Sequence, residues 1–497
     1  MHVLIVTSLS ARKIVEKEIE KIKESIGLNT IIDVLALPIS VIALAPKEFI
    51  KHHLLKHDLK KYDYIILPGT IKYDLKDLSE ELGIKIVKSP SRIELLKTMF
   101  LIGLEKFSPS ISGDKIIEQN IEQIYATANK YFMEKTEWLR INNKNLVPLK
   151  PPPIVLGLLY DHVWGEEFLE QYIRVFKPDI IYLTESSTEK TFEKLVKLGY
   201  SGRLAVPPNL LDTQLLKHVS IIYGIRIDEI SNYLKYNKIL HVQAQTINNK
   251  LLSQLKNYRD KIIIDPILPT LSSQKILDKL NEYKSIIDYA KAGWITNISY
   301  SIDADTHSLY PFLLELLIEA GVSLLIIHEF EEKLVWSLQE IVEARKLLTI
   351  SRYLGTNPRD IGIDLLYLKS KTYVYPEYEK PDKIVFATRD PAYQIDPMGI
   401  FKIRVNHKEH VIEVLYIGRK GKILIKGRSC EEIRDTILRL GLVSLMNHAF
   451  YLGGEICRAY EALRISKNYE QEKPLLPQRW NTKNNQGKVY SENLGNP

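Results

Sequence analysis

Two polar residues that directly follow short apolar runs have the clearest chemical potential in this sequence. Asp265 follows "KIII" at 261–264, and Asn297 follows "AGWIT" at 292–296. A carboxylate accepts two N–H bonds at once, and an amide donates to one ring atom while it accepts from another. Together they suit the edge of a flat heterocycle with amino and oxo groups. The alternative is that each side chain caps the helix that follows it.

Further polar residues follow other apolar runs of the same segment. They are Asp161, His162, Thr184, Glu185, Pro207, Pro208, Asn209, Gln243, His328 and Glu329. Asp161, Glu185 and Glu329 are candidates for acid or base catalysis. Neither His162 nor His328 belongs to an HxH or ExxH pair, so we expect them to line or pack against a site, and we predict no metal.

The elements that must position these residues are eight short apolar runs separated by amphipathic helical stretches. We predict strands at 154–159, 179–183, 203–206, 219–223, 238–242, 261–264, 292–296 and 322–327. Eight strand–helix units in about 220 residues indicate a (β/α)8 TIM barrel. Because chemistry in such barrels occurs at the carboxyl ends of the strands, the polar residues above should meet at one mouth.

The first 112 residues also alternate strands and helices, with strands at 2–8, 31–38, 62–70 and 84–90. This pattern predicts a Rossmann-like, doubly wound α/β domain. Thr7, Ser8, Gly69 and Thr70 lie at carboxyl ends of its strands, where such folds bind ligands, and the alternative is that they only form turns. The sequence has no GxGxxG motif, so no dinucleotide site is predicted.

The remaining segments complete the domain prediction. "KIVFATR" and residues 399–429 read as antiparallel hairpins, and two helices follow, which together indicate a small α+β domain. "PLKPPP" at 148–153 marks a sharp break. The predicted parts are a Rossmann-like domain at 1–112, a helical connector at 113–150, the barrel at 151–372, the α+β domain at 373–472 and a disordered tail at 473–497.

Composition excludes several classes of protein. The net charge of +7 comes from dispersed lysines, so it gives no case for nucleic-acid binding. The two cysteines, Cys430 and Cys457, cannot build a disulfide framework. No apolar run is long enough for a membrane span, and the N-terminus lacks the basic region of a signal peptide. We therefore expect a cytoplasmic protein without a membrane partner.

Five stretches carry a resemblance to a known family. They are "IIIDPIL", "TNISYSIDADTHSL", "GVSLLIIHEFEEKLVWSLQEIVEARKLL", "GTNPRDIGIDLLYLKSK" and "LGLVSLMNHAFYLGGEICRAYEAL". With them, the chain resembles the archaeal dihydropteroate synthase-related family over nearly its whole length. The resemblance implies a pterin-binding barrel in folate- or methanopterin-type metabolism, acting in pterin–arylamine condensation or one-carbon transfer. A reduced pterin is then the substrate or ligand, with no other cofactor.

The resemblance also assigns residues. Asp265 matches the family's pterin-binding Asp, and Asn297 is similar to the Asn of the methyltransferase branch. Asp303 in "IDAD" and Lys333 also match the family pattern, so the substrate-binding candidates are these four residues. A methyltransferase would need a separate corrinoid-carrying protein, because the chain has no DxHxxG signature. A homodimer is left open.

The chain departs from the family at five positions. Tyr182 stands where the family has an acidic residue, Pro207 and Pro208 replace a strand-end pattern with Asp, and Val335 and Trp336 stand where the family has Arg and Gly. The loop that holds the pyrophosphate of an activated pterin is not recognisable, which weakens the synthase reading most. The alternative function is therefore a catalytically degenerate barrel that serves as a binding or assembly module.

Overall fold

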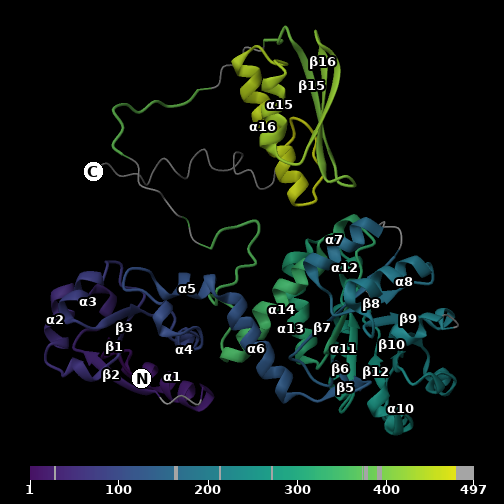
Figure 1. Cartoon of the computed structure of the whole chain (residues 1–497), viewed down its shortest axis with the longest axis horizontal. Coiled ribbons are helices and arrows are strands. Elements are labelled where there is room, and N and C mark those ends of the chain that lie inside the picture. The colour runs from purple at the N-terminus through teal and green to yellow at the C-terminus, as the bar shows by residue number, and fades with distance from the viewer. Residues whose placement is uncertain are drawn as a thin grey trace. The chain divides into compact units, whose positions relative to one another are not determined.

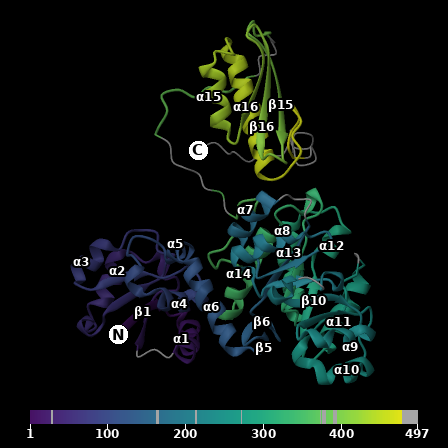
Figure 2. The ribbon, with the colours of Figure 1, turned by 45° about the vertical axis from the view of Figure 1, so that its right-hand side comes forward.

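The computed structural model describes residues 1–26, 30–161, 166–211, 214–269, 272–371, 373, 379–388 and 394–476. The chain forms two compact units, Met1–Thr372 and Tyr373–Pro497. Unit 1 contains a parallel sheet and a closed barrel, and unit 2 contains an antiparallel sheet with helices (Figures 1 and 2). Each unit is described separately below.

The N-terminal part of unit 1 is a four-stranded parallel sheet in the order β2-β1-β3-β4. Its strands and helices are β1 (His2–Ser8), α1 (Arg12–Ile26), β2 (Ile31–Leu37), α2 (Lys47–Leu54), β3 (Tyr64–Leu67), α3 (Lys76–Leu82), β4 (Lys85–Lys88) and α4 (Leu96–Ile102). One face of the sheet packs against α2 and α3, and the other packs against α1 and α4. Short β-branched runs fit such a sheet because both of its faces are buried.

Eight parallel strands close into a barrel, as the sequence predicts. In chain order they are β7 (Val155–Tyr160), β8 (Ile180–Leu183), β9 (Leu204–Val206), β10 (Val219–Ile225), β11 (Ile239–Gln243), β12 (Ile262–Asp265), β13 (Ala290–Trp294) and β14 (Leu324–Ile327). Successive side chains alternate between the barrel interior and the surrounding helices. The two sides form separate apolar cores, one inside the barrel and one between the strands and the helices.

The helices that follow the strands surround the barrel (Figure 1). They are α7 (Glu166–Phe176), α8 (Glu189–Leu195), α9 (Ile230–Tyr233), α10 (Asn249–Leu255), α11 (Ser273–Ser285), α12 (Thr296–Tyr300), α13 (Thr306–Glu319) and α14 (Ser337–Leu354). Together with the strands, they give the α/β barrel architecture expected from the sequence.

A hairpin that the sequence analysis does not predict closes the amino-terminal end of the barrel. The predicted helical connector does contain α5 (Gly113–Gln119) and α6 (Ile121–Lys135), but β5 (Trp138–Ile141) and β6 (Lys144–Pro148) follow them. Leu139 and Val147 of the hairpin are buried with the barrel interior. The helical prediction is therefore wrong for the hairpin, whose apolar side chains cover the barrel floor.

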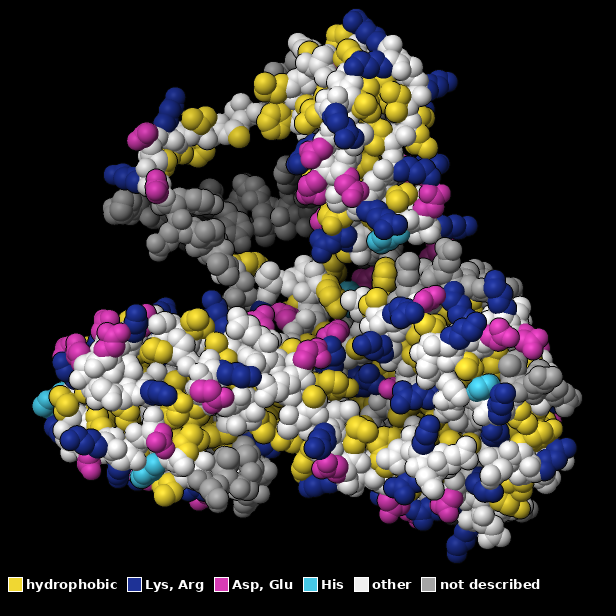
Figure 3. Space-filling view, in the orientation of Figure 1, with side chains coloured by type: hydrophobic (Ala, Val, Ile, Leu, Met, Phe, Trp, Pro, Cys, Tyr) yellow, Lys and Arg dark blue, Asp and Glu magenta, His cyan; other side chains and the backbone are white. Residues whose placement is uncertain are grey.

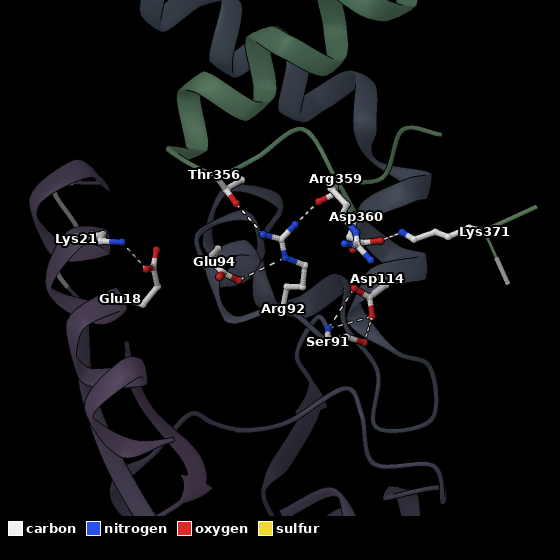
Figure 4. Close-up of polar contacts among 10 residues, drawn as sticks. All are labelled: Glu18, Lys21, Ser91, Arg92, Glu94, Asp114, Thr356, Arg359, Asp360 and Lys371. Carbon is white, nitrogen blue, oxygen red and sulfur yellow. Dashed lines mark hydrogen bonds and ion pairs between the residues drawn. The ribbon is translucent and has the colours of Figure 1, made fainter. Parts of the chain in front are cut away.

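Helix α14 belongs to both parts of unit 1. Leu348 packs in the outer layer of the barrel, whereas Ile350 and Leu354 pack in the core of the N-terminal sheet. Arg92 adds a polar contact, because its guanidinium donates to Thr356 Oγ1 at 2.9 Å and to the Arg359 carbonyl (Figure 4). Shared apolar packing and the hydrogen bonds of Arg92 connect the sheet to the barrel.

Unit 2 is a three-stranded antiparallel sheet covered by two helices. The strands are β15 (Gly399–Asn406), β16 (Val411–Gly418) and β17 (Gly421–Gly427), and the helices are α15 (Cys430–Arg439) and α16 (Met446–Arg464). The predicted hairpins over 399–429 and both helices are confirmed. The predicted strand "KIVFATR" is wrong, because residues 383–388 have no regular structure. Residues 477–497 of the predicted tail lie outside the described part of the chain.

Charged side chains of both signs are interspersed over the face of unit 1 drawn in Figure 3. Such mixing is the expected surface of a chain whose excess charge comes from scattered lysines. In the ranges that the structure describes, no helix combines the length and the apolar character that a membrane crossing requires.

Candidate functional site at the barrel mouth

Strand alternation decides which polar residues face the barrel interior at its carboxyl-terminal end. Ile239 and Ile263 point into the interior, so His241, Gln243 and Asp265 on the same strands share that side. Strands β11 and β12 are paired with Gln243 opposite Asp265. The mouth therefore has a histidine, an amide and a carboxylate next to one another.

Asp265 is fully buried and extensively hydrogen-bonded. Its Oδ1 accepts from the backbone N–H of Ile267 at 2.9 Å and from the Tyr283 hydroxyl at 3.3 Å. Its Oδ2 accepts from Nε2 of Gln243 at 3.3 Å. A carboxylate offers about four acceptor positions, so roughly one remains on Oδ2. The bond to Ile267 is a turn contact, and it holds a β-branched residue at a φ of 58°, which is unusual and strained.

Aromatic side chains fill the interior just below this carboxylate. The ring of Tyr182 lies 5.1 Å from that of Tyr223 and 6.0 Å from that of Trp294. The Tyr182 hydroxyl is 3.3 Å from Nδ1 of His241, within hydrogen-bond reach. Burial raises the pKa of Tyr182 well above its usual value, so this hydroxyl stays neutral. The residue that departs from the family pattern is thus a structural part of the mouth.

Several polar atoms around the mouth are buried without a hydrogen-bond partner in the described part of the chain. They are Nε2 of His241, Nε1 of Trp294, Oγ1 of Thr296 and Nδ1 of His328. Nε2 of His241 lies 3.4 Å from Oδ2 of Asp265, but without the alignment of a hydrogen bond. Buried polar groups are normally paired with protein, water or ligand, so this group of atoms marks the place where a bound molecule would be recognised.

Asn297 lies in the first turn of α12. The sequence analysis predicts it directly after the strand, but it is the third residue after the last residue of β13. The strand β13 ends earlier than predicted, because Trp294 is its last paired residue and Ile295 turns into the helix layer. Asn297 is half-buried, and its side chain has no partner among the described residues. It is therefore free to bind a ligand rather than to cap the helix.

Lys333 and Asp303 hold the loop that follows α12. The Lys333 ammonium donates to the carbonyls of Tyr300 and Ile302 at 3.0 and 3.3 Å and pairs with Asp303 at 3.2 Å. The Asp303 side chain is 99% exposed, so it points to solvent. The pair acts on the position of the loop, and we expect little direct contact with a buried ligand.

Glu329 faces away from the mouth. Leu325 and Ile327 pack in the outer layer of the barrel, and alternation places Glu329 on the same side. Its Oε1 accepts from the Tyr172 hydroxyl and, at 2.8 Å, from the backbone N–H of Leu338 in the first turn of α14. Burial raises the pKa of Glu329 to about 7. The carboxyl thus fastens α14 to α7, and His328, not Glu329, faces the interior.

The remaining predicted residues lie at the rim. Asp161 accepts a hydrogen bond from Ser186 at 3.3 Å, and Glu185 is exposed beside Tyr223, whose pKa is raised by burial and by this charge. Pro208 begins a short 3-10 turn, and Trp336, at a φ of 74°, precedes α14. His162 lies outside the described residues. Asp161 and Glu185 are therefore the acid or base candidates that lie near the mouth.

Sequence reasoning overlooked His241, Tyr283 and Trp294. Counting residues in steps of two back from Gln243 would have placed His241 on the interior side, and the same count from Ala290 would have placed Trp294 there. Tyr283 had no signal in its own segment, because it reaches Asp265 from the neighbouring helix α11. Its contribution depends on tertiary packing alone.

The histidine of unit 2 is part of a separate polar cluster. Nδ1 of His448 lies 3.0 Å from Oδ2 of the buried Asp396, which also accepts from Ser444 and from the Leu445 backbone N–H. Burial opposes ionisation of Asp396, but these hydrogen bonds hold its pKa well below the usual range. Glu455, two turns along the helix, accepts from Arg458 and Tyr469. His448 is thus a satisfied packing histidine.

Two family models match parts of the chain. Residues 2–91 match "Family of unknown function (DUF6513)", and residues 395–472 match "PterinBD-DUF4346". A curated relative, an uncharacterised protein of Methanocaldococcus jannaschii, is 27% identical over 533 aligned residues. That alignment covers 96% of this chain and 99% of the relative. The chain is thus similar to a full-length archaeal protein whose printed name gives no activity.

Solved structures of two synthases are also similar. The dihydropteroate synthase of Yersinia pestis is 12% identical, with a TM-score of 0.27, and the match covers 40% of this chain and 93% of that one. A dihydropteroate synthetase with its product is 12% identical, with a TM-score of 0.30, and the match covers 44% and 98%. The description of the fold rests on the strand order of the barrel itself.

Proposed function

We propose that this protein binds a reduced pterin at the carboxyl-terminal end of its barrel, as part of folate- or methanopterin-type metabolism. The observation that carries the proposal is the buried Asp265 carboxylate, with the unpaired Nε2 of His241 3.4 Å away. Unpaired polar atoms of Trp294 and His328 lie at the same end of the barrel. A pterin has an aminopyrimidinone edge with adjacent N–H donors and further acceptors on the ring. Donors matched to a buried carboxylate form strong, charge-assisted hydrogen bonds.

In this proposal, Asp265 anchors the amino edge of the pterin. One acceptor position on Oδ2 is open, and displacement of the Gln243 amide at 3.3 Å provides a second. Asn297 binds the opposite edge, because its amide is half-buried and unpaired in the described part of the chain. The aromatic rings of Tyr182 and Trp294 supply a flat, apolar floor beneath the heterocycle.

Two further observations support the proposal. The sequence resemblance supports it, because Asp265 matches a pterin-binding Asp and Asn297 is similar to the Asn of the methyltransferase branch. The name of the model that matches residues 395–472 refers to a pterin-binding domain. A condensation or a one-carbon transfer would need a proton donor or acceptor near the ring, and Asp161 and Glu185 are the candidates for that role.

A second candidate function follows from Tyr182. Its ring is completely buried and occupies interior space next to Trp294 and His241. If the aromatic cluster closes the mouth, the barrel is a binding or assembly module without chemistry. This alternative predicts that reduced pterins do not bind to the mouth at all.

Tryptophan fluorescence tests the proposal directly. A pterin bound above Trp294 should quench its emission, and Asp265→Asn should weaken binding about 100-fold by removing the charge that accepts the amino edge. Asp278→Asn is the matched control, since Asp278 is exposed on α11 and, among the described residues, accepts from Gln274 alone. Trp294→Phe should lose most of the quenching while a calorimetric signal of binding persists. Equal quenching in both Asp variants would contradict the assignment of Asp265.

A further inference from the structure

The N-terminal sheet has a cavity of its own, of about 280 Å3, at the carboxyl ends of its strands. It is lined by Thr7 and Ser8 at the end of β1, by Ser40 after β2, by Thr70 after β3 and by Ser89 after β4. The strand order reverses between β1 and β3, and ligands of open α/β sheets bind at such a switch point. We call it the N-terminal cavity.

Hydroxyl groups supply the polar part of the lining. Thr7 is 4% exposed, and its hydroxyl has no hydrogen-bond partner in the described ranges. Because Thr7 lines the cavity, its hydroxyl is available to a group bound there. Ser40 and Thr70 also have hydroxyls without partners among the described residues. The end of β1 and two loops therefore bring hydroxyls without partners among the described residues to one cavity.

The other hydroxyls of the lining serve the protein itself. Ser8 and Ser10 are 3.0 Å apart, and Ser10 donates to the Ser40 carbonyl at 2.6 Å. Ser89 donates to the Pro90 carbonyl at 2.8 Å and accepts from the Gly69 N–H at 3.3 Å. A Cβ on Gly69 would lie 1.9 Å from the Ser89 carbonyl oxygen, so only glycine allows this approach. These bonds fix the loops around the unpaired donors.

The start of α1 adds amide donors and a favourable field. Ala11 lines the cavity and directly precedes the helix. Its carbonyl accepts from the N–H groups of Ile14 and Val15, so the N–H groups of Arg12 and Lys13 are the first-turn donors without a backbone acceptor in the described ranges. A 15-residue helix carries partial positive charge at this end. No charged side chain is among the lining residues.

The two arginines that follow lining residues in the sequence are engaged elsewhere. Arg12 pairs with Glu16 at 2.7 Å, and Arg92 points to Thr356 and Arg359 (Figure 4). Asp114 accepts from the N–H and the hydroxyl of Ser91, a lining residue, and does not itself line the cavity (Figure 4). Negative charge at this site would thus be balanced by hydroxyls, amides and the helix.

We propose that the N-terminal cavity binds a small phosphate monoester. Hydroxyls and helix-terminal amides form a recurrent oxyanion cradle, and phosphate accepts from all of them. The phosphate lies at the start of α1 and accepts from Thr7, and the organic group packs on apolar residues such as Val15, Ile66 and Leu96. The cavity is at the lower limit of the ~300–1,000 Å3 that is usual for ligand sites, which favours a small ester over a dinucleotide.

Calorimetric titration of the full chain with phenyl phosphate, inorganic phosphate and phenol tests the proposal. We expect phenyl phosphate to bind more tightly than inorganic phosphate, and phenol not to bind. Thr7→Val keeps the shape of the residue but removes the donor, so binding should weaken at least tenfold. Ala11→Asp places a carboxylate at the preferred capping position, which supports the helix but occupies its amides and repels phosphate, so binding should be lost.

Thr127→Val is the matched control, because Thr127 is half-buried on α6, does not line the cavity and donates to the Gln123 carbonyl of its own helix. It should bind phenyl phosphate like the wild type. Both test variants should unfold thermally close to or above the wild-type midpoint, which separates loss of binding from loss of fold. Absence of phenyl phosphate binding by the wild type, or unchanged binding in both test variants, would overturn the proposal. A preference for phenol would do the same.

Discussion

The barrel mouth and the N-terminal cavity follow the same structural rule but differ in chemistry. Both lie at the carboxyl ends of parallel strands within unit 1. At the mouth, a buried carboxylate, Asp265, is held by three protein donors. In the cavity, the buried Thr7 hydroxyl has no partner in the described ranges, and the lining is uncharged.

This difference assigns opposite ligands to the two places. The mouth offers a negative charge and suits a molecule with N–H donors, whereas the cavity offers donors and suits an anion. It also separates function from stability. Asp265 contributes to both, because three protein donors depend on it, whereas no described protein group depends on the Thr7 hydroxyl.

The largest effect is expected when the mouth loses its carboxylate. Asp265→Ala leaves the Tyr283 hydroxyl, the Gln243 amide and the Ile267 N–H without their acceptor. Unsatisfied buried groups cost ~1–3 kcal/mol each, so the free energy of unfolding should fall by about 4 kcal/mol. Urea denaturation followed by circular dichroism measures this, with Asp278→Asn as the control. A loss no greater than that of the control would show that Asp265 is not a structural centre.

A pH-dependent effect of nearly that size is expected on the outer side of the barrel. Burial raises the pKa of Glu329 to about 7, so the folded state favours the protonated form. Stability from this group is present below the ordinary glutamate range and is lost as the pH rises through about 7. Glu329→Gln should therefore raise the free energy of unfolding at pH ~8 by up to about 3 kcal/mol and change little at pH ~4. Urea titrations at both pH values measure it, and a uniform shift would contradict the role of ionisation.

A smaller change of stability is expected in the cavity. Thr7→Val removes a buried hydroxyl that has no partner in the described part of the chain. Without ligand, the free energy of unfolding should change by less than ~1 kcal/mol, since no hydrogen bond within the described residues is lost with that hydroxyl. Thermal unfolding followed by calorimetry measures the difference, with Thr127→Val as the reference. A decrease of more than ~1 kcal/mol would show that the Thr7 hydroxyl is bound by the protein itself, and the contrast with Asp265 would fail.

The smallest effect concerns competition at the mouth. The Gln243 amide occupies Oδ2 of Asp265, which a pterin would need. Gln243→Ala should therefore tighten binding of a reduced pterin about two- to fivefold. The factor is small because the ligand replaces one long hydrogen bond, which contributes less than ~1 kcal/mol. Fluorescence titration measures it. Weaker binding would mean that Gln243 contacts the ligand rather than competing with it.

The fold is largely predictable from this sequence because its strands are short, β-branched and regularly spaced. The eight barrel strands and the parallel N-terminal sheet are present as predicted. The hairpin β5–β6 was not predicted, because it follows directly after helices and its strands are short. Its apolar residues are buried only because they cover the floor of the barrel, which a local sequence pattern does not reveal.

The site was predictable only where alternation was sufficient. Asp265 is the last residue of β12 and faces the barrel interior, as its position after "KIII" suggests. Glu329 faces the helices instead, because side chains alternate and His328, one residue earlier, takes the interior side. Tyr283 joins the site from a helix, which no local pattern reveals. The N-terminal hydroxyls were noted as turn residues or ligand contacts, and only the packing of four loops shows that Thr7 stays unpaired.

The most direct test of the account is calorimetric titration of the full chain with a reduced pterin, comparing the wild type with Asp265→Asn. The account predicts binding to one site per chain in the wild type and about 100-fold weaker binding in the variant, with both proteins folded. No binding to folded wild-type protein would contradict a pterin site at the mouth. It would leave the barrel as a binding or assembly module closed by Tyr182 and Trp294.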